Sequence, residues 1–197
     1  MSFARGRELV LTPGPSVMPD RVLRAMQRPA PNIYEGELVE ITGSILRDLG
    51  RLAGTAGETA LYVSNGHGVW EAALSNLFSP GDAILALASG TFGHGWGDTG
   101  RVMGLDVEVL EFGRHAPVDP TVLGERLKED PAHHIKGILV VHADTSSSVR
   151  NDVLRLREVI DDVGHPALLL VDCIASFCCD VYEMDDCLLY TSDAADE

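Results

Sequence analysis

Lysine is scarce in this 197-residue sequence, in which only two of the fifteen basic residues are lysines, Lys128 and Lys136. The net charge of −15 and the lack of any basic patch argue against a nucleic-acid surface. No apolar run reaches the roughly 18 residues that cross a bilayer, and the first residues lack the apolar core of a signal peptide. We therefore expect no membrane partner and a cytoplasmic location.

Cysteine is confined to one short stretch. Cys173, Cys178, Cys179 and Cys187 lie within fifteen residues, and two of them are adjacent. This spacing suits neither a disulfide framework nor a C-x2-C zinc pair, and the seven histidines form no zinc pattern either. We expect buried thiols and no metal.

The most informative stretch is ALLLVDCIASF, residues 167–177, in which an unbroken apolar run ends in one carboxylate, Asp172. Such a run, without period-2 alternation, is typical of a parallel strand covered on both faces. Ligands of parallel sheets bind outside the carboxyl ends of the strands. Asp172 is therefore a site candidate, although a helix cap or a turn residue is an equally ordinary interpretation.

The rest of the sequence alternates between strand and helix patterns. Including the stretch above, the pattern predicts strands over 59–64, 83–89, 107–112, 137–142 and 167–172. Predicted helices lie over 20–27, 36–52, 69–78, 95–103 and 152–163, and one begins at Pro120 with Asp119 as its cap. This order predicts an α/β fold, with a mainly parallel sheet and helices on both faces.

The loops after the strands share one edge of such a sheet, and they carry a consistent set of groups. Asn65, Gly66 and His67 lie in a glycine-rich turn before a helix, which can hold a phosphate with backbone N–H groups. Trp96 could lie against a flat ring, although a core tryptophan is the more ordinary interpretation. Thr145 and Ser146 offer hydroxyl groups, in a run that more often serves only to cap a helix.

Together with Asp172, these groups make the set needed to hold pyridoxal phosphate. The ring nitrogen of this cofactor must stay protonated, and a buried carboxylate at hydrogen-bond distance stabilises the pyridinium. Asp172 is the predicted partner of that nitrogen.

Five blocks of the sequence resemble, in order, the blocks of class V aminotransferases of the alanine/serine–glyoxylate type. They are TPGPS at 12–16, SNGHGVWEAAL at 64–74, GTFGHGWGD at 90–98, HADTSSSVRND at 142–152 and LLLVDCIAS at 168–176. The resemblance implies most of the large domain of a fold type I pyridoxal-phosphate transferase. It implies that Asn65, Gly66 and His67 grip the phosphate, Trp96 stacks on the ring, Thr145 or Ser146 donates a hydroxyl and Asp172 pairs with the pyridinium.

The resemblance also implies a transamination between a small amino acid, alanine or serine, and a 2-oxo acid such as glyoxylate or pyruvate. It implies a homodimer, and a substrate-side loop formed by Pro13, Gly14 and Pro15. Family members place the Schiff-base lysine about two dozen residues beyond the aspartate, and a carboxylate-binding arginine farther on; neither is present here. We therefore expect a longer parent enzyme and no turnover by this chain itself.

The last eleven residues, CLLYTSDAADE, do not continue the apolar pattern and resemble a translated sequencing adapter. We expect 1–186 to be the amino-terminal part of the large domain and 187–197 to be a non-native tail.

Other functions remain possible at this point. A desulfurase or hydrolase reaction of the same fold type uses the same large domain, and a non-catalytic cofactor-binding remnant is a further alternative. A nicotinamide site would need G-x-G-x-x-G, and SNGHGVWE has a tryptophan where the third glycine should be. A serine hydrolase would need G-x-S-x-G, which is not found at this turn.

Overall fold

The computed structural model describes residues 14, 17–180 and 184–185, so the tail predicted over 187–197 lies outside the described residues. The chain divides into two units, Met1–Ser44 and Ile45–Glu197. In the described residues no helix has the length and apolar character needed to span a membrane.

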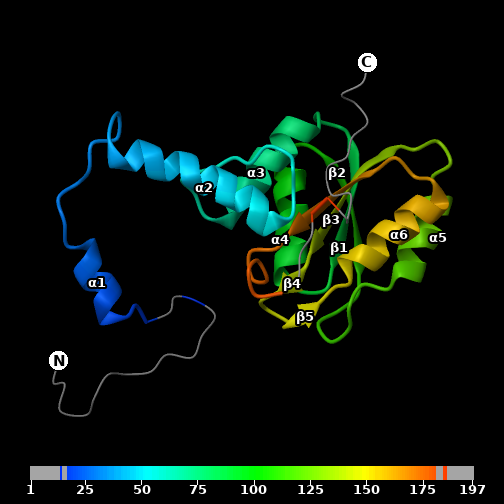
Figure 1. Cartoon of the computed structure of the whole chain (residues 1–197). Coiled ribbons are helices and arrows are strands. Elements are labelled where there is room, and N and C mark those ends of the chain that lie inside the picture. The colour runs from blue at the N-terminus through cyan, green and yellow to red at the C-terminus, as the bar shows by residue number, and fades with distance from the viewer. Residues whose placement is uncertain (1–13, 15–16, 181–183, 186–197) are drawn as a thin grey trace, which may run out of the picture. The chain divides into compact units, whose positions relative to one another are not determined.

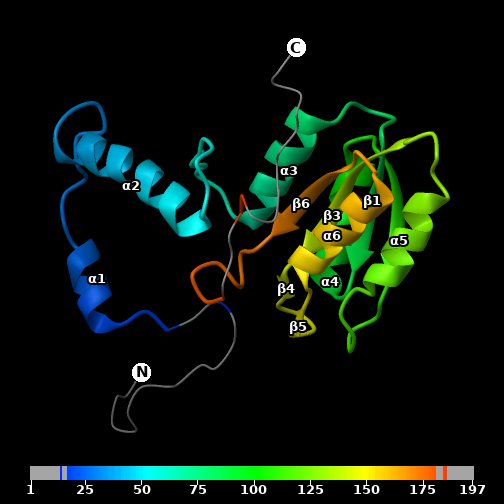
Figure 2. The same cartoon turned by 45° about the vertical axis from the view of Figure 1, so that its right-hand side comes forward.

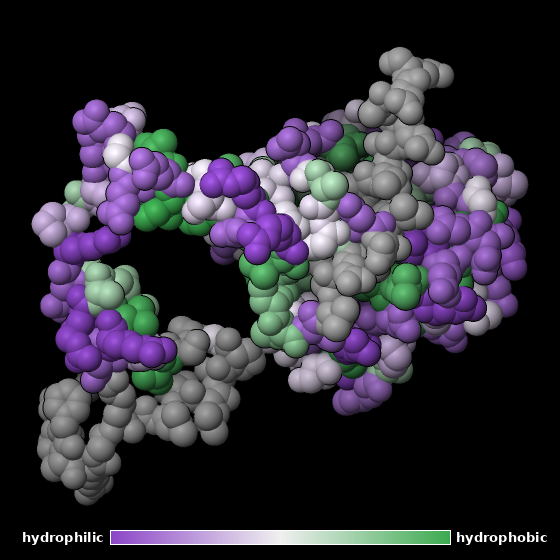
Figure 3. Space-filling view, in the orientation of Figure 1, coloured by the Kyte–Doolittle hydropathy of each residue, from purple (hydrophilic) through white to green (hydrophobic). Residues whose placement is uncertain are grey.

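The first unit contains α1 (Asp20–Met26) and the start of α2 (Glu37–Ala53), close to the helices predicted there. Its apolar side chains are largely exposed, as the green atoms on both helices show in Figure 3. On α1 these exposed residues are Val22, Leu23 and Met26. Within this unit, therefore, the amphipathic helices do not bury their apolar faces in a core.

The second unit is built on four parallel strands in the order β2-β1-β3-β6. They are β1 (Ala83–Ala88), β2 (Asp106–Glu111), β3 (Ile135–Val141) and β6 (Leu168–Asp172). A short antiparallel pair, β4 (Ala143–Asp144) and β5 (Val149–Arg150), follows β3. Val141 lies opposite Asp172 in the register, so β3 and β6 end together at one edge.

Helices cover both faces of this sheet (Figures 1 and 2). On one face, α5 (Pro120–Lys128) and α6 (Val153–Val163) pack Leu123 and Leu156 against Leu85 and Ile138. On the other face, α3 (Gly66–Leu77) and α4 (Thr91–Val102) pack against neighbouring residues of the same strands. Each fully buried leucine contributes about 1.5–3 kcal/mol relative to exposure. The predicted α/β class, with a mainly parallel sheet, is confirmed.

The strand predicted over 59–64 is wrong. These residues have no strand conformation, and no described strand pairs with them. Leu61, Tyr62 and Val63 are consequently exposed. An apolar segment forms a strand only when a neighbouring strand pairs with its backbone, and sequence pattern alone does not test for that neighbour.

The helix boundaries differ most from the predicted ones where a residue distant in sequence supplies the cap. The helix α5 begins at the predicted Pro120, where Asp119 accepts a hydrogen bond from the Thr121 N–H. The helix α6 begins at Val153, one residue after the predicted Asp152, which is its cap and accepts a hydrogen bond from the Arg155 N–H. The helix α4 begins at Thr91, four residues before the predicted Gly95. The side chain that accepts hydrogen bonds from its first turn is Asp144, more than fifty positions away in the chain.

Candidate functional site

Asp172 is the last residue of β6, and its side chain is half-buried. Its Oδ1 accepts a hydrogen bond from the Ile174 N–H at 2.9 Å, and its Oδ2 accepts one from the Trp70 indole N–H at 3.0 Å. A carboxylate oxygen can accept two hydrogen bonds, so each oxygen keeps capacity for a further donor. The apolar strand therefore delivers one oriented carboxylate to the carboxyl edge of the sheet.

The amino terminus of α3 lies beside this carboxylate. Asn65 is the N-cap, and its side chain accepts a hydrogen bond from the Gly68 N–H at 3.3 Å. Among the described residues, the backbone N–H groups of Gly66 and His67 have no acceptor. A Cβ on Gly66 would lie 3.1 Å from Ile174 Cδ1, so the helix start and the loop after Asp172 are in contact. Two uncommitted N–H groups at a helix start can hold an anion such as phosphate.

A second helix start at this edge, that of α4, is already occupied by a carboxylate. Asp144 is only 1% exposed, and its Oδ2 accepts hydrogen bonds from the Phe92 and Gly93 N–H groups at 3.0 and 3.2 Å. Its Oδ1 accepts from the Ser146 N–H and hydroxyl at 3.0 and 2.6 Å. The negative charge neutralises the positive end of the helix dipole. Of the two helix starts, α3 is therefore the one able to receive a further anion.

The structure does not support a cofactor-stacking role for Trp96. This side chain is 3% exposed within the core cluster between the sheet and its helices, and one face of its ring stacks on Trp70 at 5.6 Å between centroids. A ring so deeply buried offers no face to a ligand. Phe92, at the start of α4, is half-buried and lies 6.4 Å from the ring of His67, on the site edge. Sequence reasoning missed it because tryptophan was the more conspicuous aromatic in the same motif.

The two predicted hydroxyl donors differ in their commitments. The Ser146 hydroxyl donates to Asp144 and accepts from the Thr91 N–H at 2.7 Å, so it links β4 to α4. Thr145 is half-buried, and its hydroxyl has no hydrogen bond to any residue in the described ranges. Thr145 is therefore the hydroxyl better placed to contact a ligand.

The loop after Asp172 is fixed to the sheet but exposes two of its thiols. The Ser176 hydroxyl lies 2.9 Å from His142 Nδ1, and burial lowers the pKa of that imidazole. Cys178 and Cys179 are exposed, so the expectation that the cysteines are buried is wrong for this pair. Cys173 is partly buried. Its burial and, to a smaller extent, the negative charge of Asp172 raise the pKa of its thiol to about 11. Cys187 lies outside the described residues.

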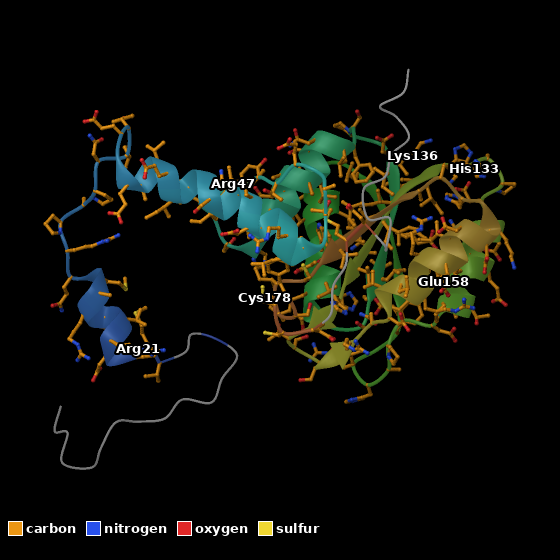
Figure 4. The ribbon with its side chains drawn as sticks, viewed as in Figure 1. Arg21, Arg47, His133, Lys136, Glu158 and Cys178 are labelled. Carbon is orange, nitrogen blue, oxygen red and sulfur yellow. The ribbon has the colours of Figure 1, made fainter. Side chains whose placement is uncertain are left out.

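Neither lysine lies at this edge of the sheet. Lys128 is exposed at the end of α5, and Lys136 lies near the amino end of β3, where its Nζ donates to the His133 carbonyl at 3.1 Å. Figure 4 shows Lys136 and Cys178 at opposite ends of the unit. Of the predicted substrate loop, Pro13 and Pro15 lie outside the described residues, so its role stays a prediction.

A pocket of about 430 Å³ lies at the other edge, around the amino ends of β1, β2 and β3. Several of its charged side chains already have protein partners. Arg126 binds both carboxylate oxygens of Glu108 at 2.8–3.0 Å, and Asp130 accepts from the Ile135 N–H at 2.8 Å and lies 3.4 Å from His165. We assign no ligand to this pocket, because the strand ends that bind ligands in parallel sheets are at the opposite edge.

Direct contacts link most of the predicted site residues at the carboxyl edge. Asp172 contacts α3 through Trp70, the ring of His67 lies near Phe92 of α4, and Thr91 contacts the β4 loop through Ser146. Trp96 lies behind this edge, in the core. The arrangement brings together an anion site, a partly exposed aromatic ring, a hydroxyl and a carboxylate.

Comparison with known proteins relates this chain to aminotransferases, although no family model matches it. It is 38% identical over 172 residues to a serine–glyoxylate aminotransferase of Methylorubrum extorquens, and that match covers 87% of this chain and 43% of the relative. It is 35% identical to the serine–glyoxylate aminotransferase of Arabidopsis thaliana, with 93% and 46% covered. A 32% identical relative is an L-aspartate–glyoxylate aminotransferase of Paracoccus denitrificans. The chain spans less than half the length of these relatives.

Solved structures show the same fold. An alanine–glyoxylate aminotransferase from Nostoc sp. superposes with a TM-score of 0.78 at 23% identity, covering 95% of this chain and 51% of that one. A pyridoxamine–pyruvate aminotransferase from Mesorhizobium loti gives a TM-score of 0.78 at 24% identity, with 91% and 45% covered.

Proposed function

We propose that this chain, a homologue of the serine–glyoxylate and L-aspartate–glyoxylate aminotransferases, forms the cofactor-binding part of a pyridoxal-phosphate-dependent aminotransferase. The parent enzyme would transfer an amino group between a small amino acid and a 2-oxo acid such as glyoxylate. The observation that carries this proposal is the placement of the Asp172 carboxylate beside the uncommitted N–H groups of Gly66 and His67. The carboxylate matches the protonated ring nitrogen of the cofactor, and the N–H groups match its phosphate.

The residues present fit that cofactor. The start of α3 has free N–H donors for a phosphate dianion, and it lacks a side chain at Gly66 where the loop after Asp172 approaches. Asp172 has acceptor capacity on both oxygens for the protonated ring nitrogen. Phe92 replaces Trp96 in our assignment as the ring beside the cofactor, and Thr145 is the proposed hydroxyl contact.

When bound, pyridoxal phosphate supplies an electron sink for cleavage of a bond at the amino acid α-carbon. The proposed task of Asp172 is to hold a proton on the ring nitrogen, because a charge-assisted hydrogen bond to a carboxylate stabilises the cationic ring. The proposed task of α3 is to fix the phosphate and thereby the position of the ring. Asp144 has no contact with the ligand in this proposal; it holds α4 and Phe92 in place.

The chain supplies no lysine at this edge, so we propose that it binds the cofactor without a covalent link. Substrate choice, a homodimer of the parent enzyme and its cytoplasmic location also remain proposals. The transamination assignment is favoured over a desulfurase or hydrolase reaction because the sequence relatives reported above are aminotransferases.

Equilibrium dialysis of the 197-residue chain against pyridoxal phosphate tests the cofactor assignment. We expect saturable binding that Asp172→Ala weakens about tenfold or more, because a hydrogen bond to a charged group is lost. Asp106→Ala is the matched control, since it removes an exposed carboxylate from the opposite edge of the same sheet. Equal affinity of both variants, or no binding by the unmodified chain, would contradict the proposal.

A further inference from the structure

The only two tryptophans of the sequence lie against each other beside the candidate site. Trp70 is on α3 and Trp96 is on α4, and their rings are nearly parallel, with an angle of 11° and centroids 5.6 Å apart. Both side chains are buried, at 4% and 3% exposure. Stacked rings of this size are held rigidly by the surrounding core.

The two indole N–H groups of this pair have different partners. The Trp70 N–H donates to Asp172 Oδ2 at 3.0 Å, across 102 residues of sequence. The Trp96 N–H is buried and has no hydrogen-bond partner within the described ranges. Since a buried donor without a partner is unfavourable, Trp96 is placed there by its packing and not by its polar group.

The Trp70 bond matters because Asp172 is at the end of its strand. The Ile174 N–H holds the other oxygen, Oδ1, but it belongs to the same loop as the aspartate and moves with it. Trp70 is the donor from a different element, and its ring is packed between Trp96 and the side chains of the core. The bond therefore fixes the rotation of the carboxylate relative to α3, whose first residues form the proposed phosphate site.

We infer that Trp70 is a positioning residue that sets the orientation of the Asp172 carboxylate toward an aromatic nitrogen cation. This inference rests on the proposed function for the identity of the cation. It attributes the orientation of the side chain at the end of β6 to a helix residue that lies 102 positions away in the chain.

Two conservative variants separate the hydrogen bond from the packing. Trp70→Phe keeps an aromatic ring against Trp96 but removes the donor to Asp172. Trp96→Phe is the matched control, because it also shortens one ring of the stack and removes an N–H that has no partner in the described part of the chain. We expect Trp70→Phe to weaken pyridoxal-phosphate binding about tenfold, the effect typical of one hydrogen bond to a charged group. We expect Trp96→Phe to bind as the unmodified chain does.

A measurement without cofactor tests the hydrogen bond itself. The ¹⁵N-labelled chain has two indole N–H signals, and Trp96→Phe identifies the one from Trp70. Asp172→Ala should move the Trp70 proton signal upfield and leave that of Trp96 nearly in place. An unmoved Trp70 signal would overturn the inference, whether or not the chain binds cofactor.

The two experiments also separate this inference from the proposed function. If the unmodified chain binds cofactor and both phenylalanine variants bind it as tightly as the unmodified chain does, the positioning role is wrong while the proposed function stands. If the unmodified chain does not bind cofactor, the proposed function fails, and the Trp70 signal in Asp172→Ala still decides whether this residue orients the carboxylate.

Discussion

Replacing Gly90 by alanine should destabilise the second unit strongly, because this glycine lies against the Asp144 carboxylate. A Cβ at residue 90 would overlap the carboxyl carbon and both carboxyl oxygens of Asp144. Both residues are buried, so neither the backbone nor the carboxylate has free space to enter. Overpacking of this kind costs about 1–3 kcal/mol.

If the carboxylate moves away, it gives up hydrogen bonds from the first turn of α4. The Phe92 and Gly93 N–H groups would lose their acceptor, and each bond to a charged group contributes on the order of 1.5–3 kcal/mol. Because the structure will follow the less costly of the two routes, we expect a loss of about 1–3 kcal/mol in the free energy of unfolding.

Gly95→Ala is the matched control on the same helix. A Cβ there would meet the Trp70 ring at 3.6 Å, an ordinary van der Waals contact, and alanine gains up to about 1 kcal/mol in helix propensity. Urea unfolding followed by tryptophan fluorescence gives both values from the shift in midpoint at constant slope. Equal stability of the Gly90→Ala and unmodified chains would refute the role given to Asp144.

Three further results are expected. Iodoacetamide at pH 8 should modify Cys178 and Cys179 well before Cys173, because a pKa of about 11 leaves the Cys173 thiol about one part in a thousand ionised; peptide mass spectrometry that finds Cys173 labelled first would be inconsistent with its burial. Lowering the pH from 7.5 to 5.5 should reduce the free energy of unfolding. Burial, only partly offset by the hydrogen bond to Asp130, lowers the pKa of His165 in the folded chain, and burial also lowers the pKa of His142. The unfolded chain therefore binds more protons than the folded chain as the pH falls through about 6.5. Burial opposes ionisation of Asp130, but hydrogen bonds hold its pKa at about 2, so the stability that Asp130 contributes is kept until far lower pH. A His165→Asn variant that keeps the full pH slope of the unfolding free energy would show that another group causes the slope. Borohydride reduction of the chain with pyridoxal phosphate should leave Lys128 and Lys136 without a stoichiometric pyridoxyl label, and such a label on either lysine would mean that it reaches the cofactor.

The parts of the fold that depend on local pattern were predictable from the sequence. The strand that ends at Asp172 is a continuous apolar run, and the caps at Asp119 and Asp152 stand next to the helices they begin. The start of α4 was misplaced because its cap, Asp144, is distant in sequence. The segment 59–64 was misassigned because strand formation depends on a neighbour that apolar composition does not reveal.

The candidate site was predictable as a set of loops but not in its contacts. Parallel strand order brings the loops after β1, β3 and β6, with Thr91, Thr145 and Asp172, to one edge. Gly66 follows no strand in the structure, so its place at this edge depends on the packing of α3. Which aromatic ring faces that edge depends on the packing of α3 against α4, and there Trp96 pairs with Trp70 in the core. The hydrogen bond from Trp70 to Asp172 had no sequence signal, because tryptophan in the interior of a helix ordinarily indicates core packing.

The most direct test of the account is whether pyridoxal phosphate binds beside the Trp70–Trp96 pair. Because the chain has no other tryptophan, its fluorescence reports on this location alone, and a cofactor that absorbs the emitted light will quench it at close range. Titration of the unmodified chain should give saturable quenching that free phosphate competes away and that Asp172→Ala weakens about tenfold or more. Binding detected by dialysis without any tryptophan quenching would place the cofactor elsewhere and contradict the account.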